Sequence, residues 1–185
     1  MRRTTIPPLP PVLDVCCGPR HFWFDKKDDR VLFVDKRRET LSIRTGTKQR
    51  LVIDPDIIAD FTKLPFTSNT FVLVVFDPPH IVRKDTAPGK SIMRKTYGCL
   101  STKDWRSTLR HGFAECFRVL QPKGVLIFKW AECSVKIHEV LSLTPEKPLF
   151  GDKNITNNHN NTYWISFLKP TKDEANKKNI RTFLK

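Results

Sequence analysis

Four short apolar runs constrain the fold of this chain more than any other feature of its sequence. They are rich in β-branched and aromatic residues and are bounded by Gly, Pro or Asp, and they cover residues 12–16, 31–34, 51–53 and 71–76. Runs of this length and composition are typical of strands that are buried on both faces. Each run is therefore expected to form a buried strand.

The second half of the chain alternates helical and strand patterns. Apolar residues recur every three or four positions from 101 to 120, which predicts an amphipathic helix with Ser101 and Asp104 as its capping pair. Gln-Pro-Lys-Gly at 121–124 is expected to end that helix. The remaining predicted elements are a strand at 125–128, a helix at 135–143, an apolar run at 148–150, a polar loop at 151–161 and a last strand at 163–168.

Strands that alternate with helices imply an α/β fold. The expected architecture is a Rossmann-like, doubly wound, mostly parallel sheet with a C-terminal antiparallel hairpin, and its ligands should bind beyond the carboxyl ends of the strands. A length of 185 residues fits one domain with one core. The predicted divisions are an extended Pro-rich lead-in at 1–11, the domain at 12–168 and a flexible basic tail at 169–185.

The charge of the chain points to an anionic partner, because 33 Lys and Arg against 19 Asp and Glu leave a formal net charge of +14. Nucleic acid is the expected partner; the alternative is a basic surface that only keeps the protein soluble. The five cysteines show no C-x-x-C spacing, which argues against a disulfide framework or a zinc site, so no metal is expected. No run approaches membrane-spanning length, so an intracellular, cytoplasmic location without membrane association is expected.

Two of the predicted strands end in residues suited to a nucleotide cofactor. The first run leads into Asp14, two small residues, Cys16 and Cys17, and Gly18. A cofactor can approach backbone closely only where side chains are small. Asp35 closes the second run, where a carboxylate is well placed to accept two ribose hydroxyls. Taken singly, each pattern also fits an ordinary strand end with a surface acid.

Two further segments resemble the class I methyltransferases that use S-adenosylmethionine (SAM). Residues 60–66, followed by the Phe-led run at 71–76, resemble that family's adenine-recognition segment, and 118–125 are similar to the turn before its fifth strand. The resemblance spans residues 12 to 130 and implies SAM as cofactor and S-adenosylhomocysteine as product. It places Asp14, Cys16, Cys17 and Gly18 at the methionine end of SAM, Asp35 at the ribose, and Asp60 and Phe61 at the adenine.

The loop after the first run, which contains Gly18 and Arg20, departs from the family pattern. It has one glycine where the family often has two or three, and Arg20 stands where a final glycine is common. Val72 also replaces an acid that is often found after the strand's leading Phe. These differences imply either modest SAM affinity or a pocket that residues 21–24 complete in another way.

Asp77, Pro78, Pro79 and His80 directly follow the fourth run, at the carboxyl end of its strand. They resemble the Asp/Asn-Pro-Pro-aromatic motif of methyltransferases that act on amino groups of adenine, cytosine or guanine, and of some protein amide methylases. A carboxylate and a backbone carbonyl that accept the N–H groups of the amine would favour its nucleophilic form, and His80 would stack on a planar acceptor. The alternative is a structural Pro-Pro turn with an Asp cap.

Basic residues near this motif are candidates for substrate binding. The segment 81–100 is expected to be a long basic loop that grips phosphates, or else a solvated insertion; its cations include Arg83, Lys84, Lys90, Arg94 and Lys95. Lys129 and Trp130 end the fifth strand. Trp130 is expected either to face the acceptor or to pack in the core.

As a whole the chain resembles small phage and prophage methyltransferases with Asp-Val-Cys-Cys-Gly, Phe-Asp-Pro-Pro-His and Phe-Lys-Trp segments. The resemblance implies N-methylation of an exocyclic amino group of a base in DNA or RNA. The chain lacks space for a separate target-recognition domain, so the grip on substrate is expected from the 81–100 loop, the tail or a protein partner. One alternative is N-methylation of a protein amide or a small amine; another is a catalytically degenerate nucleic-acid-binding protein.

Overall fold

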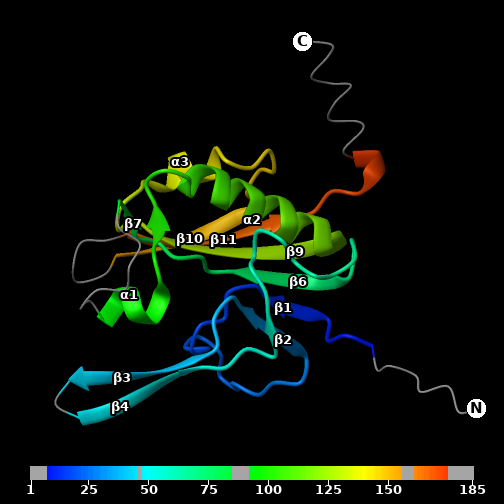
Figure 1. Cartoon of the computed structure of the whole chain (residues 1–185). Helices are drawn as coiled ribbons and strands as arrows, with labels where there is room; N and C mark the ends of the chain where they lie inside the picture. Colours follow the sequence, from blue (N-terminus) through cyan, green and yellow to red (C-terminus); the bar gives the residue numbers. More distant parts are fainter. Residues whose placement is uncertain (1–7, 46, 85–91, 156–160, 175–185) are drawn as a thin grey trace, which may run out of the picture.

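A seven-stranded sheet forms the centre of the computed structural model, which describes residues 8–45, 47–84, 92–155 and 161–174 (Figure 1). The strand order is β10-β11-β9-β6-β1-β2-β5. The run β9-β6-β1-β2-β5 is parallel, whereas β11 pairs antiparallel with β9 and β10 pairs antiparallel with β11. The strands are β1 (Val12–Asp14), β2 (Val31–Asp35), β5 (Ile57–Ile58), β6 (Phe71–Phe76), β9 (Leu120–Ala131), β10 (Phe150–Ile155) and β11 (Asn161–Leu168). This arrangement confirms the predicted α/β, Rossmann-like, mostly parallel sheet with a C-terminal hairpin.

The predicted helices are present but shorter than expected. They are α2 (Trp105–Val119) and α3 (Ile137–Leu141), and α2 lies along one face of the sheet over β9 and β6 (Figure 1). The apolar stripe of α2 faces the sheet and buries residues such as Leu109 and Phe113. The predicted capping pair is wrong, because the Asp104 side chain makes no capping hydrogen bond and the Ser101 hydroxyl accepts the Lys103 N–H instead.

An aromatic cluster joins α2 to the sheet. The ring of Phe113 lies 5.4 Å from that of Phe76 and 4.8 Å from that of Phe128, measured between ring centroids. All three side chains are buried, as is Phe61, whose ring meets the edge of Phe76 at 5.2 Å. Burial of this much apolar surface is the main force that holds the helix on the sheet.

One of the four predicted strand runs lies outside the main sheet. Residues 51–53 belong to β4 (Thr47–Ile53), which pairs antiparallel with β3 (Glu39–Thr45) in a hairpin outside the main sheet. The third parallel strand is instead the two-residue β5. The apolar run is short and directly follows polar residues, so this segment pairs with the preceding strand, β3, and not with the main sheet. Leu51 and Ile53 are buried and Val52 is exposed.

The described parts of the segments 151–161 and 81–100 also contain regular elements in place of the predicted loops. Residues 150–155 form β10, because β11 offers them a strand edge with which to pair. The segment 81–100 contains β7 (Val82–Arg83), α1 (Ile92–Tyr97) and β8 (Leu100–Ser101), and Lys90 lies outside the described residues. The predicted lead-in at 1–11 and the predicted tail at 169–185 are described only from residue 8 and up to residue 174.

The turn predicted at 121–124 lies within β9 as a bulge. Leu120 pairs with Phe71 and Val125 pairs with Leu73, so four residues loop out of the ladder between these pairs. Lys123 has a φ of 63°, and its N–H donates to the carbonyl of Lys169. The helix therefore ends at the expected place, but the strand resumes immediately around the bulge.

Replacing Gly112 with alanine is expected to destabilise the fold by about 1 kcal/mol or more. A Cβ at this position in α2 would lie 2.7 Å from Cζ of Phe76 and 2.8 Å from Cδ2 of Phe61, so the aromatic cluster would have to shift. At an uncrowded helix position the same change stabilises by about 1 kcal/mol. Urea unfolding measures the sign, and the exposed neighbour His111→Ala is the control; a gain in stability for Gly112→Ala would show that the cluster yields freely.

Candidate functional site

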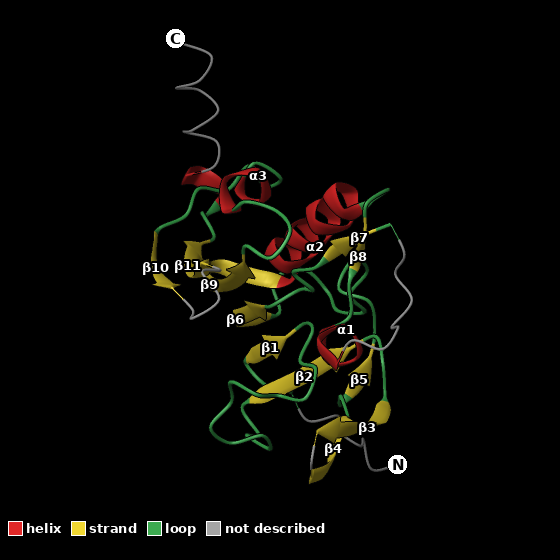
Figure 2. Cartoon of the chain, turned by 90° about the vertical axis from the view of Figure 1, so that its left-hand side faces the viewer, coloured by secondary structure: helices red, strands yellow, loops and turns green. Residues whose placement is uncertain are grey.

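A cavity of about 860 Å³ opens at the carboxyl ends of the parallel strands. Helix α1 lies on the left-hand side of Figure 1, and Figure 2 turns that side, with this edge of the sheet, toward the viewer. The loops that follow β1, β2 and β6 supply much of the cavity wall, as expected for an open parallel sheet. Of the predicted site residues, the wall contains Cys16, Cys17, Gly18, Asp35, Phe61, Asp77, Pro78, Pro79, His80, Arg94, Lys95 and Lys129. It does not contain Asp14, Asp60, Arg83, Lys84 or Trp130.

Asp14 lies beneath the wall, fully buried at the end of β1. One carboxylate oxygen accepts the indole N–H of Trp23 at 2.8 Å, and the other accepts the backbone N–H of Cys16 at 3.2 Å. Burial raises the pKa of Asp14 to about 7, against the lowering effect of these two hydrogen bonds. The structure therefore gives Asp14 a role in holding the loop after β1, under the small residues that line the cavity.

Asp35 joins that loop to the end of β2. Its Oδ2 accepts the N–H of Gly18 at 3.0 Å, and its Oδ1 accepts the N–H of Arg37 at 3.0 Å. Gly18 has a φ of +50°, and a Cβ at this position would have no neighbour within 4 Å, so glycine is favoured here by conformation and not by crowding. The side chain of Asp35 is almost fully buried, yet it forms part of the cavity wall.

Arg37 was missed by sequence reasoning, since it stands in a charged turn with no distinctive pattern. Its guanidinium donates to the carbonyls of Lys95 and Thr96 at 2.9 and 3.0 Å, and it pairs with Glu39 at 3.0 Å. Arg37 also lies 3.5 Å from the carboxylate of Asp35. It therefore connects the acid at the end of β2 to the last turn of α1, which carries Arg94 and Lys95 into the wall.

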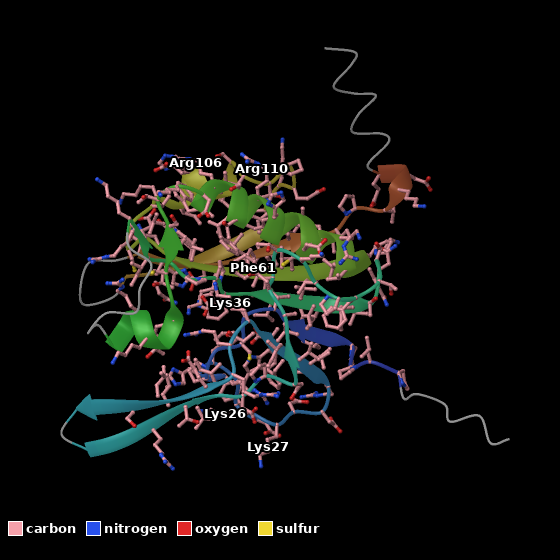
Figure 3. The ribbon with its side chains drawn as sticks, in the orientation of Figure 1. Lys26, Lys27, Lys36, Phe61, Arg106 and Arg110 are labelled. Carbon is pink, nitrogen blue, oxygen red and sulfur yellow. The ribbon has the colours of Figure 1, made fainter. Side chains whose placement is uncertain are left out.

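The two residues predicted for adenine lie in different environments. Phe61 is buried and contributes to the wall, as does Lys36; both are labelled in Figure 3. Asp60 is exposed, and its Oδ1 accepts the backbone N–H and the hydroxyl of Thr62 at 2.8 and 2.7 Å. Because Asp60 is engaged in this local turn, the structure does not bring its side chain to the cavity.

Asp77 sits between two partners on the wall. Its Oδ2 accepts Nζ of Lys129 at 2.8 Å. Its Oδ1 lies 2.9 Å from Nε2 of His80, a contact that pairs the two side chains when His80 is protonated, and it accepts no other hydrogen bond among the described residues. Burial alone would raise the pKa of Asp77, but the contacts with His80 and Lys129 outweigh it and bring the pKa below its usual value. Asp77 is therefore an anion at neutral pH.

The register of the sheet explains the Asp77–Lys129 pair. Phe76 of β6 pairs with Phe128 of β9, so the next residues of the two parallel strands, Asp77 and Lys129, lie side by side. On the other side of β9, Trp164 of β11 is the direct partner of Lys129. Lys129 therefore stands between the acid of one strand and the aromatic residue of the next.

Phe22 and Trp164 add an aromatic corner to the wall beside Lys129. The Lys129 ammonium lies 5.8 Å from the ring centroid of Phe22 and 5.6 Å from that of Trp164, within cation–π range. The two rings meet edge to face at 5.6 Å. Phe22 falls in the segment 21–24 that was expected to complete the pocket, whereas the sequence held no signal for Trp164.

His80 and Trp130 pack against each other. The ring of His80 meets Trp130 at 5.1 Å, nearly perpendicular, and its Nδ1 is buried without a partner among the described residues. Trp130 is fully buried and donates its indole N–H to the carbonyl of Val135 at 3.0 Å. Trp130 is therefore a core residue that supports His80, which corrects its prediction as a substrate-binding residue.

The basic residues of segment 81–100 divide into two groups. Arg94 and Lys95 of α1 reach the cavity wall. Arg83 and Lys84 are exposed and lie outside it. Among the residues that the structure describes, no group of three or more His, Cys, Asp or Glu is placed to hold a metal ion. No helix in the same part of the chain is long and apolar enough to cross a membrane.

Replacing Lys129 with methionine is expected to raise the pKa of Asp77, because one of the groups that lower it is removed while the burial remains. In the natural chain the pKa of Asp77 is lower in the folded than in the unfolded state. The Asp77 anion therefore stabilises the fold at pH values above the unfolded pKa, and this contribution is lost as the pH falls through the folded pKa. The variant should therefore lose about 2 kcal/mol at about pH 7, and less toward pH 4.

Urea unfolding at these two pH values measures the difference. The exposed Lys63→Met, which removes the same charge outside the cavity, is the control. An equal loss of stability for Lys129→Met at both pH values would show that the charge of Asp77 does not depend on Lys129.

The sequence matches no protein-family model and no curated protein. Several solved structures share its fold. The PH0226 protein from Pyrococcus horikoshii OT3 is 18% identical, with a TM-score of 0.53 over 86% of this chain and 81% of that one. A SAM-dependent methyltransferase from Methanosarcina mazei is 13% identical, with a TM-score of 0.53 over 87% and 92% of the two chains. A Burkholderia thailandensis 1,6-didemethyltoxoflavin-N1-methyltransferase, solved with S-adenosylhomocysteine, is 11% identical, with a TM-score of 0.50 over 86% and 71%. At these identities the likeness shows a shared fold.

Proposed function

We propose that this chain is a SAM-dependent methyltransferase that methylates an exocyclic amino nitrogen of a nucleic-acid base. The observation that carries the proposal is that Asp35, at the end of β2, and the segment from Asp77 to His80, which follows β6, line one cavity at the carboxyl ends of parallel strands on either side of β1. Ligand sites in open parallel sheets lie at this edge. The sharing of a fold with methyltransferases that use SAM supports the choice of cofactor.

Several residues of the cavity wall fit SAM. The Asp35 carboxylate would accept ribose hydroxyls, the apolar faces of Phe61 and Leu41 suit an adenine ring, and the backbone at Gly18 allows close approach of the methionine end. Burial raises the pKa of the Cys17 thiol, so this residue is a neutral part of the wall. When bound, SAM supplies a methyl group on a cationic sulfur.

The residues around Asp77 fit an amine acceptor. Asp77 is an anion, and its Oδ1, which faces His80, has lone pairs left to accept a further hydrogen bond. This oxygen would accept an N–H of the substrate and so orient the nitrogen lone pair toward the methyl group. The methylated nitrogen must then lose a proton, and the Asp77 carboxylate, with His80 beside it, would accept this proton.

A small heteroaromatic amine is the second candidate acceptor. The aromatic corner of Phe22 and Trp164 would suit a planar ring, and the Burkholderia enzyme that shares the fold is named as an N1-methyltransferase of 1,6-didemethyltoxoflavin. The net charge of +14 favours the nucleic-acid acceptor, because a field of this sign attracts phosphates and does little for a neutral ring.

Calorimetry with SAM, followed by transfer of a labelled methyl group, tests the proposal. The acceptors to compare are single- and double-stranded DNA, RNA, free bases and a protein extract. We expect SAM to bind and the label to enter nucleic acid and to be released by nuclease. Label in free heteroaromatic amines alone would favour the second candidate. Salt-sensitive binding of nucleic acid without SAM binding or methyl transfer would show a degenerate binding protein.

A further inference from the structure

A basic depression of about 390 Å³ adjoins the cavity, between the loop after β1 and the end of β4. Four cations line its walls, and we define it by the three that are exposed, Lys26, Lys27 and Arg50; the fourth is Arg20. Gly18, Pro19 and His21 line both the depression and the cavity, so the two hollows are adjacent. One ligand with two groups could therefore place one group in each hollow.

Arg20 ties the two walls of the depression together. Its guanidinium donates to the carbonyl of Lys26 on one wall and to that of Asp54 on the other, the latter at 2.6 Å. It also pairs with Asp56 at 3.1 Å and lies 3.7 Å from the ring centroid of Phe33. Arg20 has a φ of 55°, and its side chain is only 15% exposed. The depression is therefore a fixed feature of the fold, and the charge of Arg20 is already matched by an acid.

The three remaining cations face solvent. Lys26, Lys27 and Arg50 are exposed, and their side chains have no ion-pair partner among the described residues. The one acid on the walls, Asp54, pairs with Arg38 at 3.0 Å. The pKa of His21 is lowered, first by burial and then by the positive charge of Lys26. The walls thus present an uncompensated positive charge.

We infer that the basic depression binds the phosphodiester backbone of a single-stranded nucleic acid whose base enters the cavity. This inference rests on the proposed function. Unpaired Lys and Arg side chains neutralise phosphates, and a base can reach a hollow at the end of the sheet only when it is out of a duplex. The shared residues Gly18, Pro19 and His21 place phosphates and base in adjacent hollows. The surface differs from the 81–100 segment that the sequence suggested.

The double variant Lys26→Glu with Lys27→Glu tests this inference. The probes are fluorescent single-stranded DNA and RNA oligonucleotides and a duplex of the same sequence, titrated by anisotropy over a salt series. We expect the Kd for single strands to rise by about tenfold or more. The slope of log Kd against log salt should fall by about 1.4, or about 0.7 for each phosphate that the protein no longer neutralises. SAM affinity should stay within about twofold of the natural chain's.

The control is Arg110→Glu with Lys147→Glu, which makes the same change in net charge at exposed positions. Arg110 lies on α2, and Figure 3 shows it on the opposite side of the molecule from Lys26 and Lys27. Equal weakening by the two double variants would assign the effect to net charge alone and overturn the inference. The inference would also be overturned if the Lys26→Glu, Lys27→Glu chain kept the natural oligonucleotide affinity and methyl transfer. In that case the proposed function would stand.

A different result would identify failure of the proposed function itself. If the natural chain bound SAM but neither bound nor methylated any oligonucleotide, the nucleic-acid acceptor would be wrong, and the inferred phosphate surface would be overturned with it. Preference for the duplex over the single strands would overturn the claim that an unpaired base is presented.

Discussion

Replacing Asp77 with alanine is expected to lower kcat for methyl transfer by about 100- to 1,000-fold, the usual cost of removing one preorganised group that stabilises the transition state. The reason is that, in the proposed function, Oδ1 of Asp77 would hold the amine beside His80, since Oδ2 is taken by Lys129. The Kd for SAM should change by about twofold or less, because Asp35 lies at another part of the cavity wall. Single-turnover transfer of a labelled methyl group measures kcat, and calorimetry measures the Kd.

The alanine variant leaves Lys129 without its partner, so folding must be measured alongside activity. Asp77→Asn separates the two effects, because its side chain still has one acceptor oxygen and about the same volume. It should retain more activity than the alanine variant. The exposed Asp60→Ala is the matched control and should keep the natural kcat. Unchanged transfer by a folded Asp77→Ala chain would show that the acceptor site has been assigned to the wrong residue.

Replacing Asp35 with alanine is expected to weaken SAM binding by about 100-fold. Two hydrogen bonds from ribose hydroxyls to a carboxylate, at about 1.5 kcal/mol each, account for this factor. Asp35 also accepts the N–H of Gly18 and pairs with Arg37, so its loss would loosen the loop after β1 and the contact with α1. Calorimetry with SAM and with S-adenosylhomocysteine gives the two affinities.

Asp60→Ala is again the informative comparison for the cofactor. The resemblance to class I methyltransferases assigned both acids to SAM, but only Asp35 reaches the cavity wall, and the Asp60 carboxylate is held by Thr62. We therefore expect the Asp60 variant to bind SAM with close to natural affinity. Equal weakening by both variants would mean that residues 60–62 rearrange on binding, and natural affinity in both would remove the cofactor assignment.

Much of the fold follows from local sequence because burial leaves a periodic signature. β2 is buried along its length and β6 at most of its positions, so both are continuous apolar runs, and α2 buries one side, so its apolar residues recur at helical spacing. The positions of Asp35 and Asp77 follow as well, since each stands at the end of such a run. Two strands lack such a signature, because β5 has only two residues and β10 is mostly polar. Each of them forms because of the strand with which it pairs.

The sequence by itself determined the order of the main strands and helices, and it placed the acidic and small residues at the ends of strands, because these features depend on neighbours within a few positions of the chain. Only the tertiary structure decided what meets in the cavity. The pairing of Asp77 with Lys129 depends on the register of β6 against β9, the corner of Phe22 and Trp164 depends on β11 lying next to β9, and the basic depression depends on Arg20 holding a hairpin against the first loop. These contacts join residues far apart in the chain, and packing between strands, not local preference, brings them together.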